Sequence, residues 1–516
     1  MTALDAPPRK DHPPTTTRPR LNLTVMCLAG FMIQVDVTIV NVALPRIQAG
    51  LQLNGGGLLW VVTAYALSLA ACIPVAAALG DRFGHRPVFL TGVAVFTVAS
   101  VGCALAGTGL ALVIARAAQG AGGAAMLALT LSIITESYTG DGRAGAIGTW
   151  AAVGGTGFGV GPVVGGLLLS VTGWSSVFWV NVPVGIFAFV GALVAVPRSH
   201  PSEHRLDVLG ATLCAGGLVA LSFGLTRSSA HPWSSLLVAG PVLSGVALLL
   251  AFSGWQRRAA YPMAPPALLR IRGFAPAVVV YLAAYAAFGG ILFFCTLLYQ
   301  DVAGWSVLRT GLSWLFMNVP FLVVAQCSAA LQRRLSARTQ VTAGCLGAAA
   351  GAATLTVVTV TTPFAVTAVA FVLAGAGFGA LVPVLTHVAM AEVPSRLSGI
   401  ASGLLNSARQ VGTSIGLAVL GYVAAARTLS AWHRLPGHLA RAAEADVVSG
   451  RVSSVGHALG SAYRQPAVTS FEQGYHWAVG VGAVLLALGA AVAWCAFPTR
   501  AEPVESTRAP SEGGLA

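Results

Sequence analysis

The stretch of this 516-residue chain that decides its fold is GGTGFGVGPVVGGLLLS, residues 154–170. Its glycines recur at spacings of three, four and four residues, at Gly154, Gly157, Gly161 and Gly165. At about 100° per residue, these glycines form one stripe along an apolar helix that also contains Pro162. In a bilayer such a stripe lets two backbones pack closely, and the proline bends the helix. The segment predicts a packed, bent membrane helix that serves as a seal or hinge. A helix dimerisation face is the alternative.

The composition indicates a membrane protein. Of all residues, 56% are hydrophobic and 9% are charged, whereas a soluble domain has roughly 25% charged residues. The apolar residues form fourteen segments of the length that a bilayer requires: 21–44, 58–79, 87–107, 109–134, 144–170, 175–197, 206–226, 235–255, 275–300, 309–331, 340–359, 363–390, 398–424 and 474–497. We therefore expect an all-α polytopic membrane protein with fourteen transmembrane helices.

The arginines indicate the orientation of the chain. The net charge of +13 is spread over short loops rather than gathered on one face, which argues against a nucleic-acid partner. Arginines concentrate after the even-numbered segments, as at Arg82, Arg86 and Arg143. The positive-inside rule then places both tails, 1–20 and 498–516, in the cytoplasm. The first segment follows a polar tail and is expected to be an uncleaved span of the cytoplasmic membrane.

The scarcity of lysine limits the possible sources of energy for transport. Lys10 is the single lysine of the chain, and a phosphate-binding loop of the Walker type needs a lysine after its glycines. ATP hydrolysis by that route is excluded, so transport would be driven by an ion gradient, a substrate gradient or a partner protein. The eight cysteines form no Cys-x-x-Cys pair, and we predict no metal site.

A weak internal repeat predicts the domain organisation. Residues 21–197 and 274–497 can be laid over each other as two six-helix halves, with two further helices inserted within 198–273. A long extracellular loop is expected at 425–473. Parallel halves of this kind enclose a binding cavity near the midplane of the membrane.

Ionisable residues inside the apolar segments are the main functional candidates, because each is costly there. Asp36 lies in the middle of the first segment, where loss of water favours the protonated carboxyl group. We expect Asp36 to face the cavity as a proton or cation site, and Asn41 to make a hydrogen bond between helices. The alternative is that a nearby arginine neutralises Asp36 for packing alone.

Arg116 is the second such candidate, and Gln119 shares its helix stripe. A central arginine needs a carboxylate or carbonyl partner. If Arg116 approached and left a carboxylate, it would couple protonation to conformation; a static charge pair is the alternative. Arg409 is a further candidate, expected nearer the cytoplasmic end. His387 could titrate or simply pack through a hydrogen bond, and Glu136 could be interfacial.

These residues lie in motifs that resemble the major facilitator superfamily, specifically its fourteen-helix drug:proton antiporters of the EmrB/QacA type. The similarity covers about residues 21–497. The motifs that carry it are, in chain order, DVTIVNVALP (36–45), GDRFGHR (80–86), RAAQG (116–120), Gly157 to Gly166, WSSVFWVNVPVG (174–185), RLDVLG (205–210), Tyr299-Gln300 and Arg409-Gln410-Val411-Gly412. The chain departs from the family pattern at Ala77, where glycine is usual, and at His85, where a basic residue is usual.

The resemblance implies roles for two of these motifs. In the loop around Gly84, Asp81 would cap a helix end while Arg82 and Arg86 pair across the interface of the halves, forming a cytoplasmic gate. Orienting the chain in the membrane is the alternative role of these arginines. The helix with Gly157, Gly161, Pro162, Gly165 and Gly166 would bend as the halves rock.

The resemblance also implies a function. It is export of hydrophobic or amphiphilic drugs in exchange for protons, by a monomer that uses the bilayer, a small-molecule substrate and protons but no cofactor. A dedicated exporter of one self-made antibiotic and a physiological solute transporter are the alternatives of the same fold. A membrane sensor would need a signalling domain for which the short tails leave no room. An enzyme is not expected, since no nucleophile–base pair or metal cluster stands out.

Overall fold

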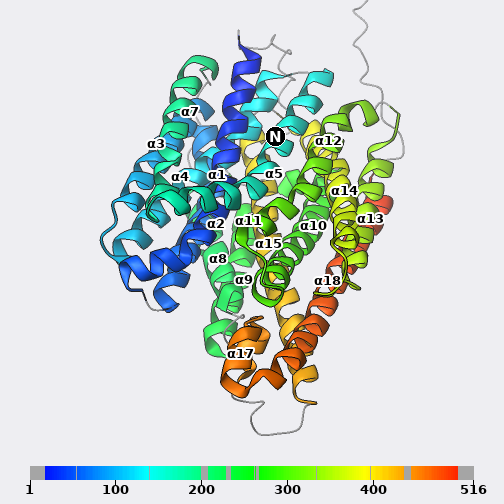
Figure 1. Ribbon diagram of the computed structural model, residues 1–516. Helices are drawn as coiled ribbons and strands as arrows, with labels where there is room; N and C mark the ends of the chain where they lie inside the picture. The colour runs from blue at the N-terminus through cyan, green and yellow to red at the C-terminus, as the bar shows by residue number, and fades with distance from the viewer. Residues whose placement is uncertain are drawn as a thin grey trace, which may run out of the picture.

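The computed structural model describes residues 18–53, 55–138, 140–198, 207–227, 234–260, 262, 266–332, 334–394, 397–434 and 443–497. Within these ranges every regular element is a helix (Figure 1). The helices are α1 (Pro19–Leu51), α2 (Gly55–Phe83), α3 (His85–Ala104), α4 (Gly109–Ser137), α5 (Gly140–Val171), α6 (Ser176–Trp179), α7 (Asn181–Ala195), α8 (Val208–Arg227), α9 (Leu236–Gln256), α10 (Phe274–Leu297), α11 (Val307–Ser313), α12 (Leu315–Gln332), α13 (Ala337–Leu355), α14 (Phe364–Ala391), α15 (Ser398–Trp432), α16 (Glu444–Val448), α17 (Val452–Leu459) and α18 (Arg464–Ala496). Three short turns complete them: η1 (Pro266–Arg270), η2 (Leu298–Val302) and η5 (Ser461–Tyr463).

Each of the fourteen predicted segments is helical, which confirms the all-α membrane class. Within the described residues, eleven helices are long and apolar enough to cross a bilayer. The segments that correspond to α5, α8 and α13 are not among the eleven, so the count of fourteen crossings stays a prediction. Large apolar side chains project outward from these helices, as at Val98 (70% exposed) and Leu236 (85% exposed). Such a surface is stable only against lipid or another apolar phase.

The contacts between helices repeat in the two parts of the chain, here called the N half (α1–α7) and the C half (α10–α18). In the N half, Gly157 and Gly161 of α5 lie directly against α1. In the C half, Gly412 and Gly416 of α15 lie against the backbone of α10 at the same four-residue spacing. The pairs α3–α4 and α13–α14 likewise meet through facing glycines. Close approach of backbones through small residues is the usual way in which membrane helices associate.

The inserted helices α8 and α9 form a hairpin that contacts both halves. Asp207 holds it together, because its carboxylate accepts hydrogen bonds from Trp255 Nε1 (2.8 Å) and Gln256 Nε2 (2.6 Å) on α9. Helix α8 packs on α2 of the N half and on α15 of the C half. Figure 1 shows the hairpin between the blue helices of one half and the yellow and orange helices of the other.

The predicted loop 425–473 is largely helical, which corrects its boundaries. Helix α15 continues to Trp432 and α18 begins at Arg464, so both run beyond the apolar segments found in the sequence. Between them lie α16 and α17, and Figure 1 shows α17 at the end of the bundle away from the start of α1. Apolar side chains around the buried Trp432 and Phe471 hold this cap together. Hydropathy detects only the part of a helix that lies in lipid, and these extensions are packed against protein instead.

Candidate functional site

Asp36 is the centre of a fully buried polar cluster inside the N half. Its Oδ2 atom lies 2.6 Å from Arg116 Nη1, in an ion pair between α1 and α4. Its Oδ1 atom accepts hydrogen bonds from Gln119 Nε2 and Asn181 Nδ2, both at 2.8 Å. Neither Asp36 nor Arg116 is more than 1% exposed. The cluster gives both carboxylate oxygens a donor, which is what a buried charge requires.

The arginine of this cluster is held from several sides. Arg116 Nη1 donates to Gln119 Oε1 (2.6 Å), and its Nε donates to the carbonyl oxygen of Val61 (3.3 Å). The guanidinium lies over the ring of Tyr65, 4.2 Å from the centroid, and 5.8 Å from that of Phe178. Cation–π contact of this kind stabilises a desolvated guanidinium. Arg116 is therefore positioned by four different groups besides its carboxylate partner.

Two further members of the cluster were not predicted from the sequence. Asn181 lies at the start of α7 and Ser100 lies in α3, where its hydroxyl oxygen accepts from Gln119 Nε2 (2.8 Å). Asn181 belongs to the quoted motif WSSVFWVNVPVG. A neutral amide or hydroxyl carries a much smaller insertion cost than a charge, so its presence in an apolar segment gave no strong signal.

The expectation that Asp36 faces the cavity between the halves is wrong, because another residue of α1 occupies that position. The cavity wall includes Gly30 and Gln34 of α1 but neither Asp36 nor Arg116. Residues 34 and 36 are about 200° apart around a helix, so they point to opposite sides. The side chain of Asn41 lies outside the described residues, as does that of Pro162.

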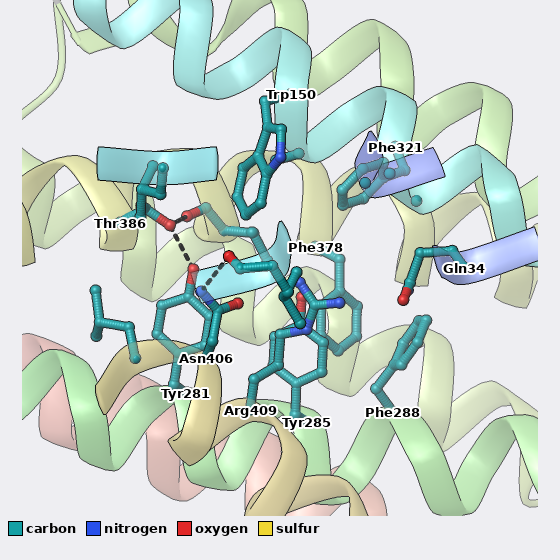
Figure 2. Close-up of a pocket in the computed structure, with 18 of the residues that line it drawn as sticks. Gln34, Trp150, Tyr281, Tyr285, Phe288, Phe321, Phe378, Thr386, Asn406 and Arg409 are labelled. Atoms are coloured by element: carbon teal, nitrogen blue, oxygen red, sulfur yellow. Dashed lines mark hydrogen bonds between the residues drawn. The ribbon is translucent and has the colours of Figure 1, made fainter. Parts of the chain in front are cut away.

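The cavity lies between the two halves, and several aromatic residues contribute to its wall. Seven described helices contribute to its wall: α1, α4 and α5 from the N half and α10, α12, α14 and α15 from the C half. Among the residues that the structure describes, six aromatic rings line it: Trp150, Tyr281, Tyr285, Phe288, Phe321 and Phe378. Figure 2 shows these rings approaching one another from opposite helices. The remaining space is about 60 Å³, far below the 300–1,000 Å³ typical of ligand sites, so a drug-sized molecule requires the halves to separate.

The secondary candidates fall in different places. Arg409 lines the cavity, with its guanidinium 5.1 Å from the ring centroid of Tyr285. It therefore belongs to the wall of the central cavity, and its expected position nearer the cytoplasmic end stays a prediction. Gln410 and His387 are half-buried on α15 and α14 and are not among the described lining residues.

The loop between α2 and α3 places a histidine between two carboxylates. His85 Nε2 lies 3.0 Å from Asp81 Oδ1, and His85 Nδ1 lies 2.8 Å from Glu136 Oε1. A neutral imidazole has only one N–H, so the doubly protonated ring suits this geometry best. His85 thus supplies the charge that the family pattern places there, and Glu136 is its partner. The turn itself depends on Gly84, whose φ of 95° disfavours other residues.

The rest of this loop joins one half to the other. Asp81 interacts with the backbone of Ile400, in the first turn of α15 in the C half. A carboxylate at that position is stabilised by the partial positive charge of the helix N-terminus. Arg86 donates to the carbonyl oxygen of Leu193 (2.6 Å) in its own half, and Arg82 lies against the ring of Phe83. Pairing of these arginines across the interface stays a prediction.

The glycine stripe of α5 packs inside the chain. A Cβ atom at Gly157, Gly161 or Gly165 would collide with Gln34, Thr38 or Ile39 of α1, whereas at Gly166 it would meet nothing within 4 Å. Gly154 lies on the cavity wall. The stripe is thus covered by α1 and is not an exposed dimerisation face.

Two similar halves of membrane helices around a central cavity define the class of solute transporters that work by alternating access. The chain belongs to the Major Facilitator Superfamily, whose family model matches residues 26–417. It is 34% identical over 429 residues to the tetracenomycin C resistance and export protein of Streptomyces glaucescens, covering 82% of this chain and 80% of that protein. It is 31% identical over 503 residues to the drug efflux pump JefA of Mycobacterium tuberculosis (strain CDC 1551 / Oshkosh), covering 94% of this chain and 99% of that protein.

The fold is also found in solved structures. The crystal structure of the human organic anion transporter MFSD10 (TETRAN) matches with a TM-score of 0.61, over 93% of this chain and 100% of that one. The sequence identity is 14%, so this likeness concerns the fold alone.

Proposed function

We propose that this protein exports hydrophobic or amphiphilic drugs or antibiotics across the cytoplasmic membrane in exchange for protons. Membership of the superfamily supports a transporter. Relatives that share most of its length are named as export, resistance and efflux proteins. The aromatic cavity between the halves supports an apolar substrate, because burial of rings against rings needs no substrate charge.

The observation that carries the proton coupling is the buried ion pair of Asp36 and Arg116. Protonation of Asp36 removes one charge and leaves a buried guanidinium facing a neutral group, which is costly. A conformation that offers Arg116 water or carbonyl oxygens then becomes favourable. Loss of the proton restores the pair. The protonation state of Asp36 therefore biases the protein between two arrangements of α1 and α4.

Helix α1 connects this pair to the substrate. Asp36 lies on one side of α1, and Gln34 lies on the other side as part of the cavity wall. The glycines of α5 hold α1 at close range, so a shift of α1 moves the wall and α5 together. Occupation of the cavity and protonation of Asp36 are then linked through one rigid helix.

The remaining features of the proposal follow from the sequence. Both termini lie in the cytoplasm, in agreement with the distribution of arginines. The protein acts as a monomer and as a transporter rather than an enzyme, with the proton gradient as its energy source and no cofactor. Lys10 as the single lysine leaves no Walker-type loop for ATP.

A second candidate is a dedicated exporter of one antibiotic made by the same cell. Relatives named for a single compound, such as the cephamycin export protein CmcT of Amycolatopsis lactamdurans (34% identical over 448 residues), favour it. Both candidates use the same cavity and the same ion pair, and they differ only in the range of compounds that trigger transport.

The test is drug-triggered proton release from everted membrane vesicles with an acidified lumen. The parent protein should release protons on addition of some compounds in a panel of antibiotics and dyes. Asp36→Asn should abolish this release. Asp446→Asn is the matched control. Asp446 pairs with Arg451 (2.7 Å) at the exposed surface, so this variant should release protons as the parent protein does.

The outcomes of this test separate the alternatives. Release by one compound alone would favour the dedicated exporter. Normal release by a folded Asp36→Asn variant would refute proton coupling at this residue. If Asp36→Asn does not accumulate in the membrane, Asp36→Glu is measured in its place. This variant retains a carboxyl group and should therefore still release protons, at a reduced rate. No release by the parent protein would refute drug:proton exchange.

A further inference from the structure

The cavity wall carries positive charge and no described negative charge. Arg409 is the single charged side chain among its described lining residues. The buried carboxylate of Asp36 is neutralised by Arg116 and does not reach the wall. A guanidinium stays protonated at any physiological pH. The electrostatic field inside the cavity therefore favours anions and disfavours cations.

Arg409 is held in place without a carboxylate. The described residues offer it no ion-pair partner, and its guanidinium rests over the ring of Tyr285. Tyr285 in turn stacks on Tyr281, with 5.6 Å between ring centroids and 2° between ring planes. The hydroxyl groups of Tyr281 and Thr386 share a hydrogen bond. Figure 2 shows the guanidinium extending to the middle of the cavity above these stacked rings. This support holds the cation in the cavity wall without a carboxylate among the described residues, so its N–H donors can serve a ligand.

Two residues that line the same space from other helices carry a buried donor without a partner among the described residues. Trp150 of α5 is 6% exposed and its Nε1 has no hydrogen-bond partner among the described residues. Asn318 of α12 is 5% exposed and its Nδ2 likewise has none. Indole nitrogen is a donor only. A buried donor without a partner is costly, and such groups call for an explanation. Both line the cavity, so a bound substrate can satisfy them with acceptor oxygens.

The remaining wall selects for planar rings. Phe288 and Phe378 meet edge to face, with 5.0 Å between centroids, and Tyr285 is tilted in the same way against both of them. Aromatic surfaces arranged edge to face provide both ring faces and ring edges to a guest. An aliphatic chain would gain burial but none of these directed contacts.

We propose that the substrates of this transporter are aromatic amphiphiles that carry an acidic group and further acceptor oxygens. The acidic group, such as a carboxylate, sulfonate or ionised phenol, would bind Arg409. The rings would lie between Phe288, Phe378 and Tyr285, and carbonyl or hydroxyl oxygens would accept from Trp150 and Asn318. The proposal rests on the proposed function in one respect, namely that this cavity is the drug site.

The test is direct binding of three nearly isosteric probes to the purified protein in nanodiscs of uncharged lipid, by calorimetry against empty nanodiscs. The probes are anthracene-9-carboxylate, anthracene-9-carboxamide and 9-(aminomethyl)anthracene. The carboxylate should bind at least about tenfold more tightly than the ammonium probe, as for a charge-assisted hydrogen bond. Arg409→Gln should remove that preference while changing the affinity for the carboxamide by less than about twofold. Arg409→Lys should retain part of the preference for the carboxylate, because lysine keeps the positive charge but lacks the planar guanidinium group.

Arg427→Gln is the matched control. Arg427 also stacks on an aromatic ring, 4.0 Å from the centroid of Trp477, but it does not line the cavity. It should bind all three probes as the parent protein does. Decanoate, a carboxylate without rings, should compete weakly with the aromatic carboxylate.

Several results would overturn the proposal: equal or tighter binding of the ammonium probe, an equal loss of all three probes in Arg409→Gln, full competition by decanoate, or no binding by any probe. Binding requires no proton gradient. If the carboxylate probe binds preferentially but no compound triggers proton release in the vesicles, drug:proton exchange is refuted and the proposed substrate class stands. If protons are released but the carboxylate probe is not preferred, only the proposed substrate class is refuted.

Discussion

The two halves of the molecule use corresponding helices in different ways. In the N half, α1 and α4 are joined by the ion pair of Asp36 and Arg116. In the C half, the corresponding helices α10 and α14 are joined by the hydroxyl groups of Tyr281 and Thr386. The first pair is sealed away from the cavity, whereas both members of the second line it. The packing of the helices repeats, but the chemistry at their contact does not.

This difference teaches how a repeated fold separates two tasks. A pair of opposite charges can change its energy by several kcal/mol when one member is protonated. A pair of hydroxyl groups has no such dependence near neutral pH. In the proposed mechanism the N half contains the group that responds to protons, and the C half contributes Arg409 and most of the aromatic rings that line the cavity. Three substitutions test this comparison of the halves, in order of decreasing effect.

Arg116→Ala should have the largest effect on stability. It leaves the carboxylate of Asp36 buried without its partner, which costs about 3–5 kcal/mol. The midpoint of thermal unfolding should fall steeply when followed with a thiol-reactive dye, because Cys27, Cys103 and Cys345 are buried and react only on unfolding. The double variant Asp36→Asn with Arg116→Met should recover most of the loss. An unchanged midpoint in Arg116→Ala would show that the pair is not the main electrostatic contact of the N half.

Gly416→Ala should have an intermediate effect. A Cβ atom there would overlap the backbone of Ala286 in α10, which cannot rotate away as a side chain can. We expect a loss of about 1–3 kcal/mol, the range for overpacking, and a smaller loss for Gly161→Ala, where Thr38 is the main obstacle. Gly421→Ala and Gly166→Ala meet nothing within 4 Å. These controls should be neutral or slightly stabilised in the same thermal assay, and equal losses at all four positions would contradict the packing argument.

Tyr281→Phe should have the smallest effect. It removes one hydroxyl group from the contact of α10 and α14 and keeps the ring that stacks on Tyr285. The expected loss is about 0.5–1.5 kcal/mol, and proton release in the vesicle assay should persist. If Tyr281→Phe instead abolished proton release, the C half would also take part in coupling, and the proposed division of tasks would be wrong.

The sequence was sufficient for the class, the helices and the charged centre. Asp36 and Arg116 could be found because each is costly in an apolar segment and so needs a reason to be there. Their pairing was one of the alternatives, but its geometry depends on how α1 and α4 are rotated against each other. That rotation depends on how each helix packs against others, as Gly157 of α5 does against α1, and such contacts join residues over a hundred positions apart.

The cavity wall was much harder to predict. Phe288, Phe321 and Phe378 are ordinary apolar residues in apolar segments, and only the assembly of seven helices brings them together. Arg409 was found by its charge, but its place on the cavity wall could not be read from a motif. The ends of α15 and α18 were missed for a related reason, because hydropathy reports contact with lipid and not the continuity of a helix.

The hairpin of α8 and α9 has a consequence for the speed of the transporter. Because α8 touches α2 of one half and α15 of the other, any rocking of the halves makes it slide along at least one of them. Most of the apolar window of α9 faces outward, with 11% of it buried. The surrounding acyl chains must then rearrange in every transport cycle. The viscosity and lateral pressure of the bilayer thus act as a brake on turnover, and membrane fluidity becomes a determinant of how fast this protein clears its substrate.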